Sequence, residues 1–414
     1  METRIAAEFA GTRDGDEAES ILRACVHCGF CNATCPTYQL LGDELDGPRG
    51  RIYLMKQVLE GAEPTAKTQL HLDRCLTCRS CETTCPSGVR YGALVDIGRR
   101  IVESKVGRPP VEAAQRYSLR KGLMARSLFG AALATGRAVK AWLPREIAHR
   151  IPDARDAGVW PAARHARRML VMRGCVQPSI APNIDAAMAR VLDRVGISGT
   201  RTAAGGGCCG ALSEHLSAHD EALALARRNI DAWWPAVEAG AEAIIVTASG
   251  CGVTVRDYAH MLAGDLAYAA RAERVAKLAR DPVEVIAAEW KAIGARIALD
   301  RGALRVAFHA PCSLQHGMQI KGQVEELIDA MGHQRLPVAD AHICCGSAGT
   351  YSVLQPALAG QLKRNKLAAL EVERPHVIAS ANIGCITHLA SGTSRPVRHW
   401  IELLDERMLD AGRA

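Results

Sequence analysis

Two cysteine runs near the start of the chain share one spacing, C-x2-C-x2-C-x3-C-P. The first extends from Cys25 to Pro36 and the second from Cys75 to Pro86. With this spacing, three thiolates of a run hold one [4Fe–4S] cubane, and the fourth ligates the other cluster. The spacing therefore predicts two cubanes with exchanged fourth ligands. The predicted ligands are Cys25, Cys28, Cys31 and Cys85 for the first cluster, and Cys35, Cys75, Cys78 and Cys81 for the second.

Zinc and disulfides explain these runs less well. A zinc site closes with four ligands, usually from C-x2–4-C pairs, and gives no role to a third cysteine followed by Cys-Pro. Closely spaced triplets bridge poorly, and disulfides need an oxidising compartment. The first ten residues lack the basic start and apolar stretch of a secretory signal peptide. The 16 cysteines of this 414-residue chain therefore indicate reduced, metal-ligating thiols in a cytoplasmic protein.

Helical patterns surround the two runs. Residues 15–24 favour a short helix before the first run, and Pro48 suits the start of a helix that continues to Glu60. Further helices are expected near 66–74 and 91–105. The N-terminal part, residues 1–107, is therefore predicted to be an all-α two-cluster ferredoxin-type domain.

Residues 108–165 differ in composition, being rich in alanine, arginine and proline. We expect a helical connector, with helix over 111–143. Between Lys140 and Arg173 the chain carries eight Lys or Arg against three Asp or Glu. This basic stretch is either a solvated surface or a patch that docks on a membrane or a partner. Nucleic acid is excluded as a partner because no binding motif accompanies the charges. No run of 18 apolar residues predicts a transmembrane helix.

From Arg168 onward the chain contains two copies of one pattern. Each copy has a strand and a lone cysteine, a helix, a Cys-Cys-Gly, a second helix, and a second strand with a further cysteine. The four cysteine positions recur after 137, 136, 136 and 134 residues, which indicates an internal duplication. The cysteines are Cys175, Cys208, Cys209 and Cys251 in the first copy, and Cys312, Cys344, Cys345 and Cys385 in the second.

The two copies predict two α/β domains. Strands are expected at 169–172 and 243–248, and at 304–309 and 377–381, with helices near 182–195, 218–238, 320–332 and 356–371. Alternating strands and helices predict a parallel sheet, whose carboxyl ends would gather the cysteines at one edge. The expected fold class is therefore a multidomain α+β chain, with cysteine-rich domains at 166–295 and 296–414.

Three interpretations of the duplicated cysteines stay open. They could form further redox or metal sites, remain small buried apolar residues, or bind zinc. Several histidines lie nearby in sequence, among them His309, His316, His342 and His388. A lone histidine beside a loop is more often a satisfied rim residue than a ligand, so none of them is predicted as one. No catalytic residues are predicted either.

The chain resembles a family of electron-transfer subunits. The family includes the C subunit of anaerobic glycerol-3-phosphate dehydrogenase, lactate-utilisation proteins, heterodisulfide reductase subunits and the iron–sulfur subunits of bacterial glycolate oxidases, which are the most similar. The resemblance is carried by residues 21–31, 35–52, 229–235 and 344–350. In heterodisulfide-reductase relatives the last motif of each copy is Cys-x-x-Cys. Here the first position of that motif is Ala248 in one copy and Asn382 in the other.

The resemblance implies a role and partners. Flavin-bearing subunits would oxidise glycolate, and D-lactate-like 2-hydroxy acids, to glyoxylate or the keto acid. This chain would pass the electrons through its two [4Fe–4S] clusters, and an additional cluster in the repeats if one is present, to a membrane acceptor such as quinone. It would lie at the inner face of the cytoplasmic membrane. The alternatives are an electron-transfer subunit for glycerol-3-phosphate or lactate dehydrogenase, and a non-redox scaffold whose fold is stabilised by its clusters.

Overall fold

The computed structural model describes residues 1–414 except 145–147, 149–150, 203–204, 294–298, 300–301 and 409–414. Its N-terminal module is helical, as predicted. The module consists of α1 (Arg13–Ala24), α2 (Phe30–Ala33), α3 (Pro36–Leu41), η1 (Glu44–Asp46), α4 (Pro48–Leu59), α5 (Ala66–Asp73), α6 (Ser80–Thr84) and α7 (Tyr91–Val106). Prolines occupy the first turns of α3 and α4, where a missing N–H costs nothing.

The core of the module comes from helical stripes. Ala18, Ile21 and Leu22 are buried on one face of α1, at the spacing of a single helix side. They pack in one cluster with residues of α4 and α7, including Leu94. Arg51 of α4 is also fully buried, where it pairs with Asp46 at 3.4 Å. The core therefore holds α1, α4 and α7 together and leaves the short helices α2 and α6 to present the cysteine loops.

Each cysteine-rich repeat contains a four-stranded parallel sheet, and the two sheets have the same strand order. The first has the order β2-β1-β3-β4 and the second β6-β5-β7-β8. The strands are β1 (Arg167–Val171), β2 (Ile197–Arg201), β3 (Ile244–Ile245), β4 (Ala279–Arg280), β5 (Arg305–His309), β6 (Gln334–Leu336), β7 (Val377–Ser380) and β8 (Val397–His399). The predicted duplication and fold class are confirmed.

The inner strands agree with the sequence, but the outer ones were not predicted. The expected strands at 169–172, 243–248, 304–309 and 377–381 correspond to β1, β3, β5 and β7, although β3 is shorter than expected. The outer strands β2, β4, β6 and β8 are mixed in polarity, so no apolar run marks them. They widen each sheet by one strand on either side.

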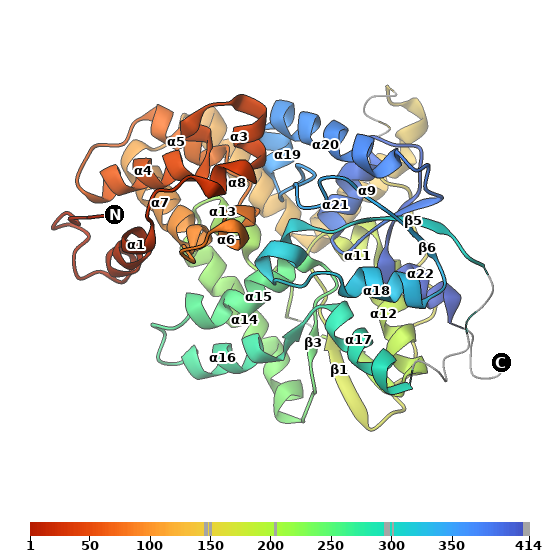
Figure 1. Cartoon of the computed structure of the whole chain (residues 1–414). Coiled ribbons are helices and arrows are strands. Elements are labelled where there is room, and N and C mark those ends of the chain that lie inside the picture. Colours follow the sequence, from red (N-terminus) through yellow and green to blue (C-terminus); the bar gives the residue numbers. More distant parts are fainter. Residues whose placement is uncertain (145–147, 149–150, 203–204, 294–298, 300–301, 409–414) are drawn as a thin grey trace.

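Helices cover the sheets and connect the strands. In the first repeat they are α11 (Gln177–Ile180), α12 (Pro182–Arg194), α13 (Ala211–His215), α14 (His219–Glu238), α15 (Ser249–Met261), α16 (Ala269–Leu278) and α17 (Pro282–Ile293). In the second they are the π-helical turn η4 (Ser313–Gly317), α18 (Gln323–Ala330), α19 (Tyr351–Leu354), α20 (Pro356–Glu371), α21 (Ile383–Ala390) and α22 (Trp400–Arg407). One apolar core runs through both repeats, so they pack as one body (Figure 1).

The connector forms α8 (Pro110–Met124), α9 (Arg126–Ala138) and η2 (Lys140–Trp142), none of which has a buried residue. Several cations of the predicted basic stretch pair within the chain, as Lys140 does with Asp153 at 2.5 Å and Arg164 with Asp193 at 2.6 Å. Arg145 and Arg150 lie outside the described residues. These pairs favour the interpretation of this stretch as a solvated surface.

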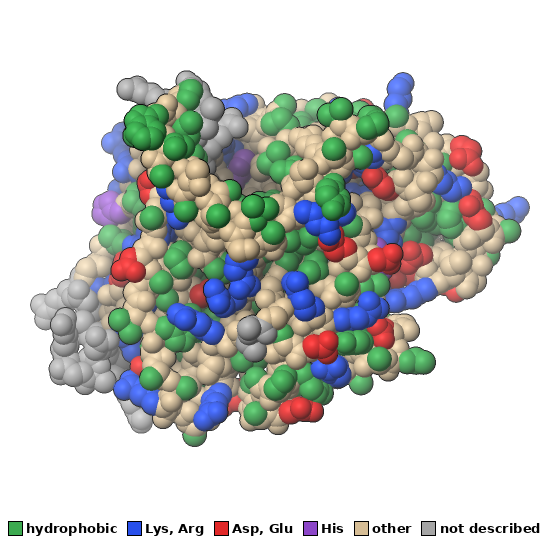
Figure 2. All heavy atoms as spheres, turned by 180° about the vertical axis from the view of Figure 1, so that it is seen from behind, with side chains coloured by type: hydrophobic (Ala, Val, Ile, Leu, Met, Phe, Trp, Pro, Cys, Tyr) green, Lys and Arg blue, Asp and Glu red, His purple; other side chains and the backbone are tan. Residues whose placement is uncertain are grey.

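Helix length and polarity also bear on membrane insertion. Among the described residues, no helix combines the length and apolar character needed to cross a bilayer. The face seen in Figure 2 carries hydrophobic, basic and acidic side chains interspersed. The domain boundaries at 107, 165 and 295 stay predictions.

Candidate metal centres

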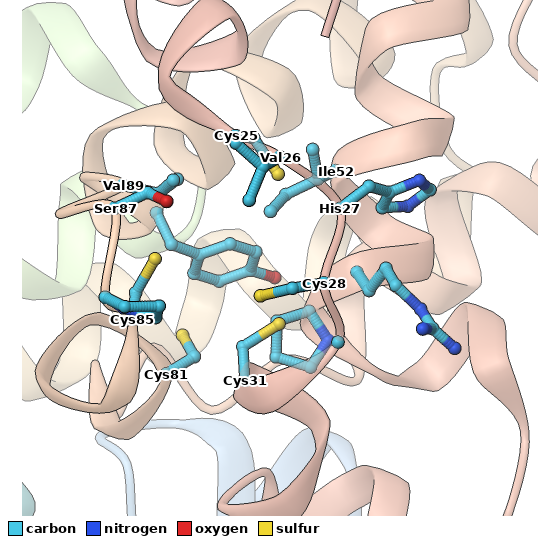
Figure 3. A pocket seen from close by; sticks show the side chains of 15 residues that line it. Cys25, Val26, His27, Cys28, Cys31, Ile52, Cys81, Cys85, Ser87 and Val89 are labelled. Atoms are coloured by element: carbon cyan, nitrogen blue, oxygen red, sulfur yellow. The ribbon is translucent and has the colours of Figure 1, made fainter.

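Five cysteines of the two runs line one cavity in the N-terminal module (Figure 3). Cys25, Cys28 and Cys31 come from the loop between α1 and α2 and from the start of α2, and Cys85 follows α6. The cavity thus gathers the four residues predicted for the first cluster. Cys81 also lines it.

Backbone conformation shapes the loop that carries the first run. His27 and Gly29 both have positive φ, at 60° and 88°, which turns the chain around the cavity. A Cβ at position 29 would lie 2.5 Å from the Arg49 guanidinium, so glycine suits the site. Burial raises the pKa of the Cys31 thiol to about 11, and Cys25 adds to the shift. A bound metal would offset this penalty, because a coordinating thiol is deprotonated outright.

A second cavity is lined by the four cysteines predicted for the second cluster, Cys35, Cys75, Cys78 and Cys81. Arg51 and Arg79 also line this cavity and place positive charge beside the thiols. Such charge suits an anionic group such as a thiolate-ligated cluster.

The two cavities share part of their walls. Pro48, Cys81 and Tyr91 line both, so the cavities are neighbours. Tyr91 is buried, and its hydroxyl donates to Cys75 Sγ at 3.6 Å. Each cavity contains the donor set that a cubane requires, four thiols drawn from both runs. The residues present therefore fit two [4Fe–4S] clusters.

In the first repeat, Cys175 follows the inner strand β1, the pair Cys208 and Cys209 follows the outer strand β2, and Cys251 lies in α15 after β3. Cys175 and Cys208 are buried together against Leu225 and Met124. Gly210 has a φ of 98°, and its N–H approaches Cys208 Sγ at 3.5 Å, so the chain turns sharply after the cysteine pair. This conformation is the relaxation expected of the glycine in Cys-Cys-Gly.

Two side chains fix the backbone of this cysteine pair. Asn229 Nδ2 donates to the Cys208 carbonyl at 2.8 Å, and the Tyr258 hydroxyl donates to the Cys209 carbonyl at 2.8 Å. Asn229 also contacts the Tyr258 hydroxyl at 2.9 Å. Both residues are fully buried. The first repeat therefore positions its thiols through a closed polar network.

In the second repeat, the thiols also form a connected group. Cys312 Sγ lies 3.9 Å from Cys344 Sγ, and the Gly346 N–H approaches Cys344 Sγ at 3.4 Å. Asn382 Nδ2 donates to Cys385 Sγ at 3.4 Å. Cys345 and Cys385 share a close group with His309, in which the three potential ligand atoms lie within 4.8 Å of one another.

The second repeat contacts the N-terminal module beside the second cavity. Cys78 packs in one cluster with Cys312 and Cys344. Burial, with Cys312 as the largest charge effect, raises the pKa of Cys78. Thr83 Oγ1 and His316 Nδ1 are 2.7 Å apart, across the same contact. In Figure 1 the second repeat's helices α19 and α20 lie next to α3.

The sequence identified the cysteines of these sites but missed one histidine. The structure brings together each predicted set of four cysteines in the runs and gathers the thiols of each repeat. His309, which was not predicted as a ligand, lies among the thiols. The strand register could have indicated it, because His309 pairs with Ser380 at the end of β7, shortly before Cys385.

Comparison with known proteins matches this division of the chain. The model of the 4Fe-4S dicluster domain matches residues 21–89, and the model of the cysteine-rich domain matches 169–256 and 306–390. The glycolate oxidase iron–sulfur subunit of Escherichia coli (strain K12) is 54% identical over 409 residues, 99% of each chain.

More distant relatives include a probable glycolate oxidase iron–sulfur subunit of Bacillus subtilis (strain 168), 28% identical over 92% of this chain and 90% of its own. Lactate utilization protein A of Exiguobacterium sp. (strain ATCC BAA-1283 / AT1b) is 25% identical over 57% of this chain and 96% of its own.

Proposed function

The chain belongs to the family of glycolate oxidase iron–sulfur subunits, and on this premise we propose that it carries electrons within a glycolate oxidase complex. Flavin-bearing partner subunits oxidise glycolate and D-lactate-like 2-hydroxy acids, and this chain receives the electrons and delivers them to a membrane acceptor such as quinone. The observation that carries the proposal is the pair of adjoining cavities, which share Cys81 and together are lined by all eight cysteines of the two runs.

We assign the ligands of the two cubanes from these cavities. The first takes Cys25, Cys28, Cys31 and Cys85, and the second takes Cys35, Cys75, Cys78 and Cys81. When bound, the clusters supply one-electron transfer. The shared wall at Cys81 and Tyr91 keeps the two sites adjacent, and the buried Tyr91 excludes water from between them.

The relay extends to the second repeat. Cys78 at the second cavity and Cys312 pack against the same cluster, which contains Cys344, so a metal centre held by the second repeat would adjoin the second cubane. We therefore propose Cys312, Cys344, Cys345 and Cys385 as the thiols of a third centre. Cys175, Cys208, Cys209 and Cys251 remain the matching candidates in the first repeat.

We place the docking site of the flavin partner at the first cavity. Cys28 is exposed there, and Val26 and Phe30, at 67% and 63% exposure, flank it in the same loop. Tyr53, 46% exposed, stacks on His27 beside them. Exposed apolar side chains that surround a redox site are typical of a surface that a partner covers.

Membrane contact would be peripheral, at the inner face of the cytoplasmic membrane. The connector supports this proposal through its exposed apolar residues, among them Leu128 on α9 and Trp142 at 84% exposure. The cations of the connector pair largely within the chain, as Arg116 does with Asp73 and Lys140 with Asp153, so exposed apolar side chains would make this contact rather than basic charge.

Replacing single ligands tests the relay. Cys28→Ser and Cys78→Ser should each remove one cubane, about four iron atoms, and stop reduction of the acceptor by the complex. Oxidation of glycolate by the flavin subunits, measured as flavin bleaching, should continue. Gln57→Ala, on an exposed face of α4, is the control and should retain both activities. Full acceptor turnover in a variant that lacks one cubane would contradict the relay.

The second candidate is the electron-transfer subunit of a lactate or glycerol-3-phosphate dehydrogenase complex. The similarity to lactate utilization protein A favours the lactate version. The substrate whose addition to the assembled complex reduces the clusters distinguishes these functions. Reduction by D-lactate or glycerol 3-phosphate alone, with none by glycolate, would replace the main proposal.

A further inference from the structure

His309 ends β5 in the second repeat and is almost fully buried, with 2% of its surface exposed. Its Nδ1 lies 3.0 Å from Ser380 Oγ on the neighbouring strand β7. Its other ring nitrogen, Nε2, has no hydrogen-bond partner among the described residues. An unpaired buried polar atom is costly, so this nitrogen calls for a partner that the polypeptide does not supply.

The surroundings of His309 are rich in sulfur. One nitrogen of its ring and the sulfur atoms of Cys345 and Cys385 lie within 4.8 Å of one another, and all three residues are buried. Cys344 lies next in sequence to Cys345, and its sulfur is 3.9 Å from that of Cys312. The thiols of Cys344 and Cys345 also interact, so the group has five donors, more than one tetrahedral ion takes.

The contact of His309 with Ser380 is typical of a histidine that binds a metal. Ligating histidines generally donate their other ring N–H to a nearby acceptor, which fixes the tautomer and the ring orientation. When Nδ1–H donates to Ser380 Oγ, Nε2 retains the lone pair that a metal binds. Ser380 is itself fully buried, so this contact is held by the sheet.

A buried cation lies close to the thiols. Lys366 is 3% exposed, and its Nζ donates to the Asp340 carbonyl at 2.6 Å. It is close enough to Cys344 and Cys345 to interact electrostatically with both thiols. A positive charge in this position stabilises a centre that is made anionic by thiolate ligands.

The first repeat lacks this histidine. The spacing of 137 residues that relates Cys175 to Cys312 relates Met172 to His309. Met172 is buried in an apolar cluster that includes Cys209. The thiol pattern is therefore duplicated, but the nitrogen donor is confined to the second repeat.

We propose that the second cysteine-rich repeat holds an iron–sulfur centre with one nitrogen ligand, His309 Nε2, beside the thiolates of Cys345 and Cys385. Cys312 and Cys344 supply the remaining thiolates. The choice of iron rests on the proposed relay, since this site adjoins the second cubane through Cys78. Histidine in place of cysteine raises the potential of an iron–sulfur centre. This centre would therefore favour accepting electrons from the cubanes.

The test uses the full chain, purified without oxygen after labelling with ¹⁵N-histidine. Iron, zinc and acid-labile sulfide are measured, and pulsed EPR follows stepwise reduction. We expect iron above the roughly eight atoms of two cubanes, and one signal coupled to a histidine nitrogen. His309→Cys should keep the extra iron, lose the coupling and shift that signal to a more negative potential. His309→Ala should lose the extra iron.

The matched control is His388→Gln in the same repeat. His388 is partly buried, and its Nε2 donates to the Ala359 carbonyl at 3.3 Å, so the variant should retain the coupling. About eight iron atoms in the unaltered chain, with or without one zinc, would overturn the inference. So would nitrogen coupling that persists in His309→Cys. In these cases two intact cubane signals would leave the proposed electron transfer through the two cubanes standing, whereas their absence from the unaltered chain would contradict the proposed function itself.

Discussion

The two cysteine-rich repeats share a sheet order and a thiol pattern, yet they surround their thiols differently. In the first repeat, Asn229 and Tyr258 close a polar network around the cysteine pair, and Met172 fills the space at the end of β1 with an apolar side chain. In the second, His309 stands at that position with a free nitrogen, and Asn382 donates to a cysteine sulfur.

Their neighbours differ as well. The thiols of the first repeat pack against Met124 at the end of α8, and those of the second pack against Leu76 and Cys78 at the second cavity. A duplicated unit has thus kept its thiols in both copies, and among the described residues the thiols of the second copy pack in one cluster with a cysteine of the second cavity. Cysteine spacing alone therefore does not identify a redox site, because the other donors and the neighbouring residues around the thiols also matter.

The largest expected effect, on iron content and acceptor reduction, comes from replacing two matching cysteines, one in each repeat. Cys345→Ser should lose the third centre and block acceptor reduction by the complex. The Cys209→Ser variant should retain the iron of the third centre. It should lose about 1–3 kcal/mol of folding stability, because the substitution buries a new hydroxyl. Iron content, acceptor turnover and thermal unfolding of the two variants check this. Equal loss of iron in both would show that the repeats are functionally equivalent.

A second contrast concerns the residues just before the last helix of each repeat. Asp281 precedes α17 and accepts from the Val283 N–H at 3.0 Å, and His399 precedes α22 and accepts from the Ile401 N–H at 3.1 Å. Burial raises the pKa of Asp281 from 3.8 to about 7 and lowers the pKa of His399 from 6.5 to about 4. Both side chains are therefore favoured in their neutral forms.

The two residues should affect stability in opposite directions of pH. Folded Asp281 binds a proton more tightly than the unfolded chain, so its contribution is present below pH 3.8 and is lost as the pH rises through about 7. Folded His399 binds a proton less tightly, so its contribution is present above pH 6.5 and is lost as the pH falls through about 4. The effects are at most on the order of 4 kcal/mol for Asp281 and 3 kcal/mol for His399.

Asn substitutions separate these two effects. Asp281→Asn should remove the loss of stability between weakly acidic and neutral pH, and His399→Asn should reduce the loss on acidification, because Asn keeps a helix-capping acceptor but does not titrate. Thermal unfolding measured in steps from pH 5 to pH 7.5 checks both. If the unfolding temperature of a variant changes with pH as that of the parent does, the replaced residue is not the source of this pH dependence.

The smallest expected effect sharpens the contrast at Asn382. Its Oδ1 accepts from the Gly250 N–H of the first repeat at 3.3 Å, and its Nδ2 donates to Cys385 Sγ. Asn382→Ala, which copies Ala248 of the first repeat, should lower the potential of the third centre slightly, because hydrogen bonds to ligand sulfur favour the reduced state. Stability should fall by about 1 kcal/mol.

A redox titration of Asn382→Ala followed by EPR checks this effect. The control is Asn365→Ala, which changes an exposed asparagine of α20 in the same repeat. An unchanged potential in Asn382→Ala, with the third centre present, would show that this hydrogen bond does not tune it.

The two runs and the duplication were predictable because both rest on local spacing. Cys25, Cys28 and Cys31 are close in sequence, and the repeat interval marks each later cysteine. The sequence also indicated most helices, since α4, α14 and α20 have clear start signals or apolar stripes. Prediction succeeded where neighbouring residues carry the information.

The features that could not be predicted from the sequence depend on contacts between distant segments. The role proposed for His309 depends on the pairing of β5 with β7, which brings it to Ser380 and the residues after it. The contact of Cys78 with Cys312 joins residues 234 positions apart, and no local pattern encodes it. The outer strand β6 has only three residues, so its place follows from the sheet and not from its own sequence.

The most direct test of the central claim is reduction by substrate. The chain is assembled with its flavin subunits, glycolate is added anaerobically without an acceptor, and EPR spectra are recorded from samples frozen at successive times. We expect the EPR signals of both reduced cubanes to appear after the flavin bleaches. A bleached flavin with both cubanes still oxidised, although dithionite reduces them and the complex turns over with its acceptor, would contradict it.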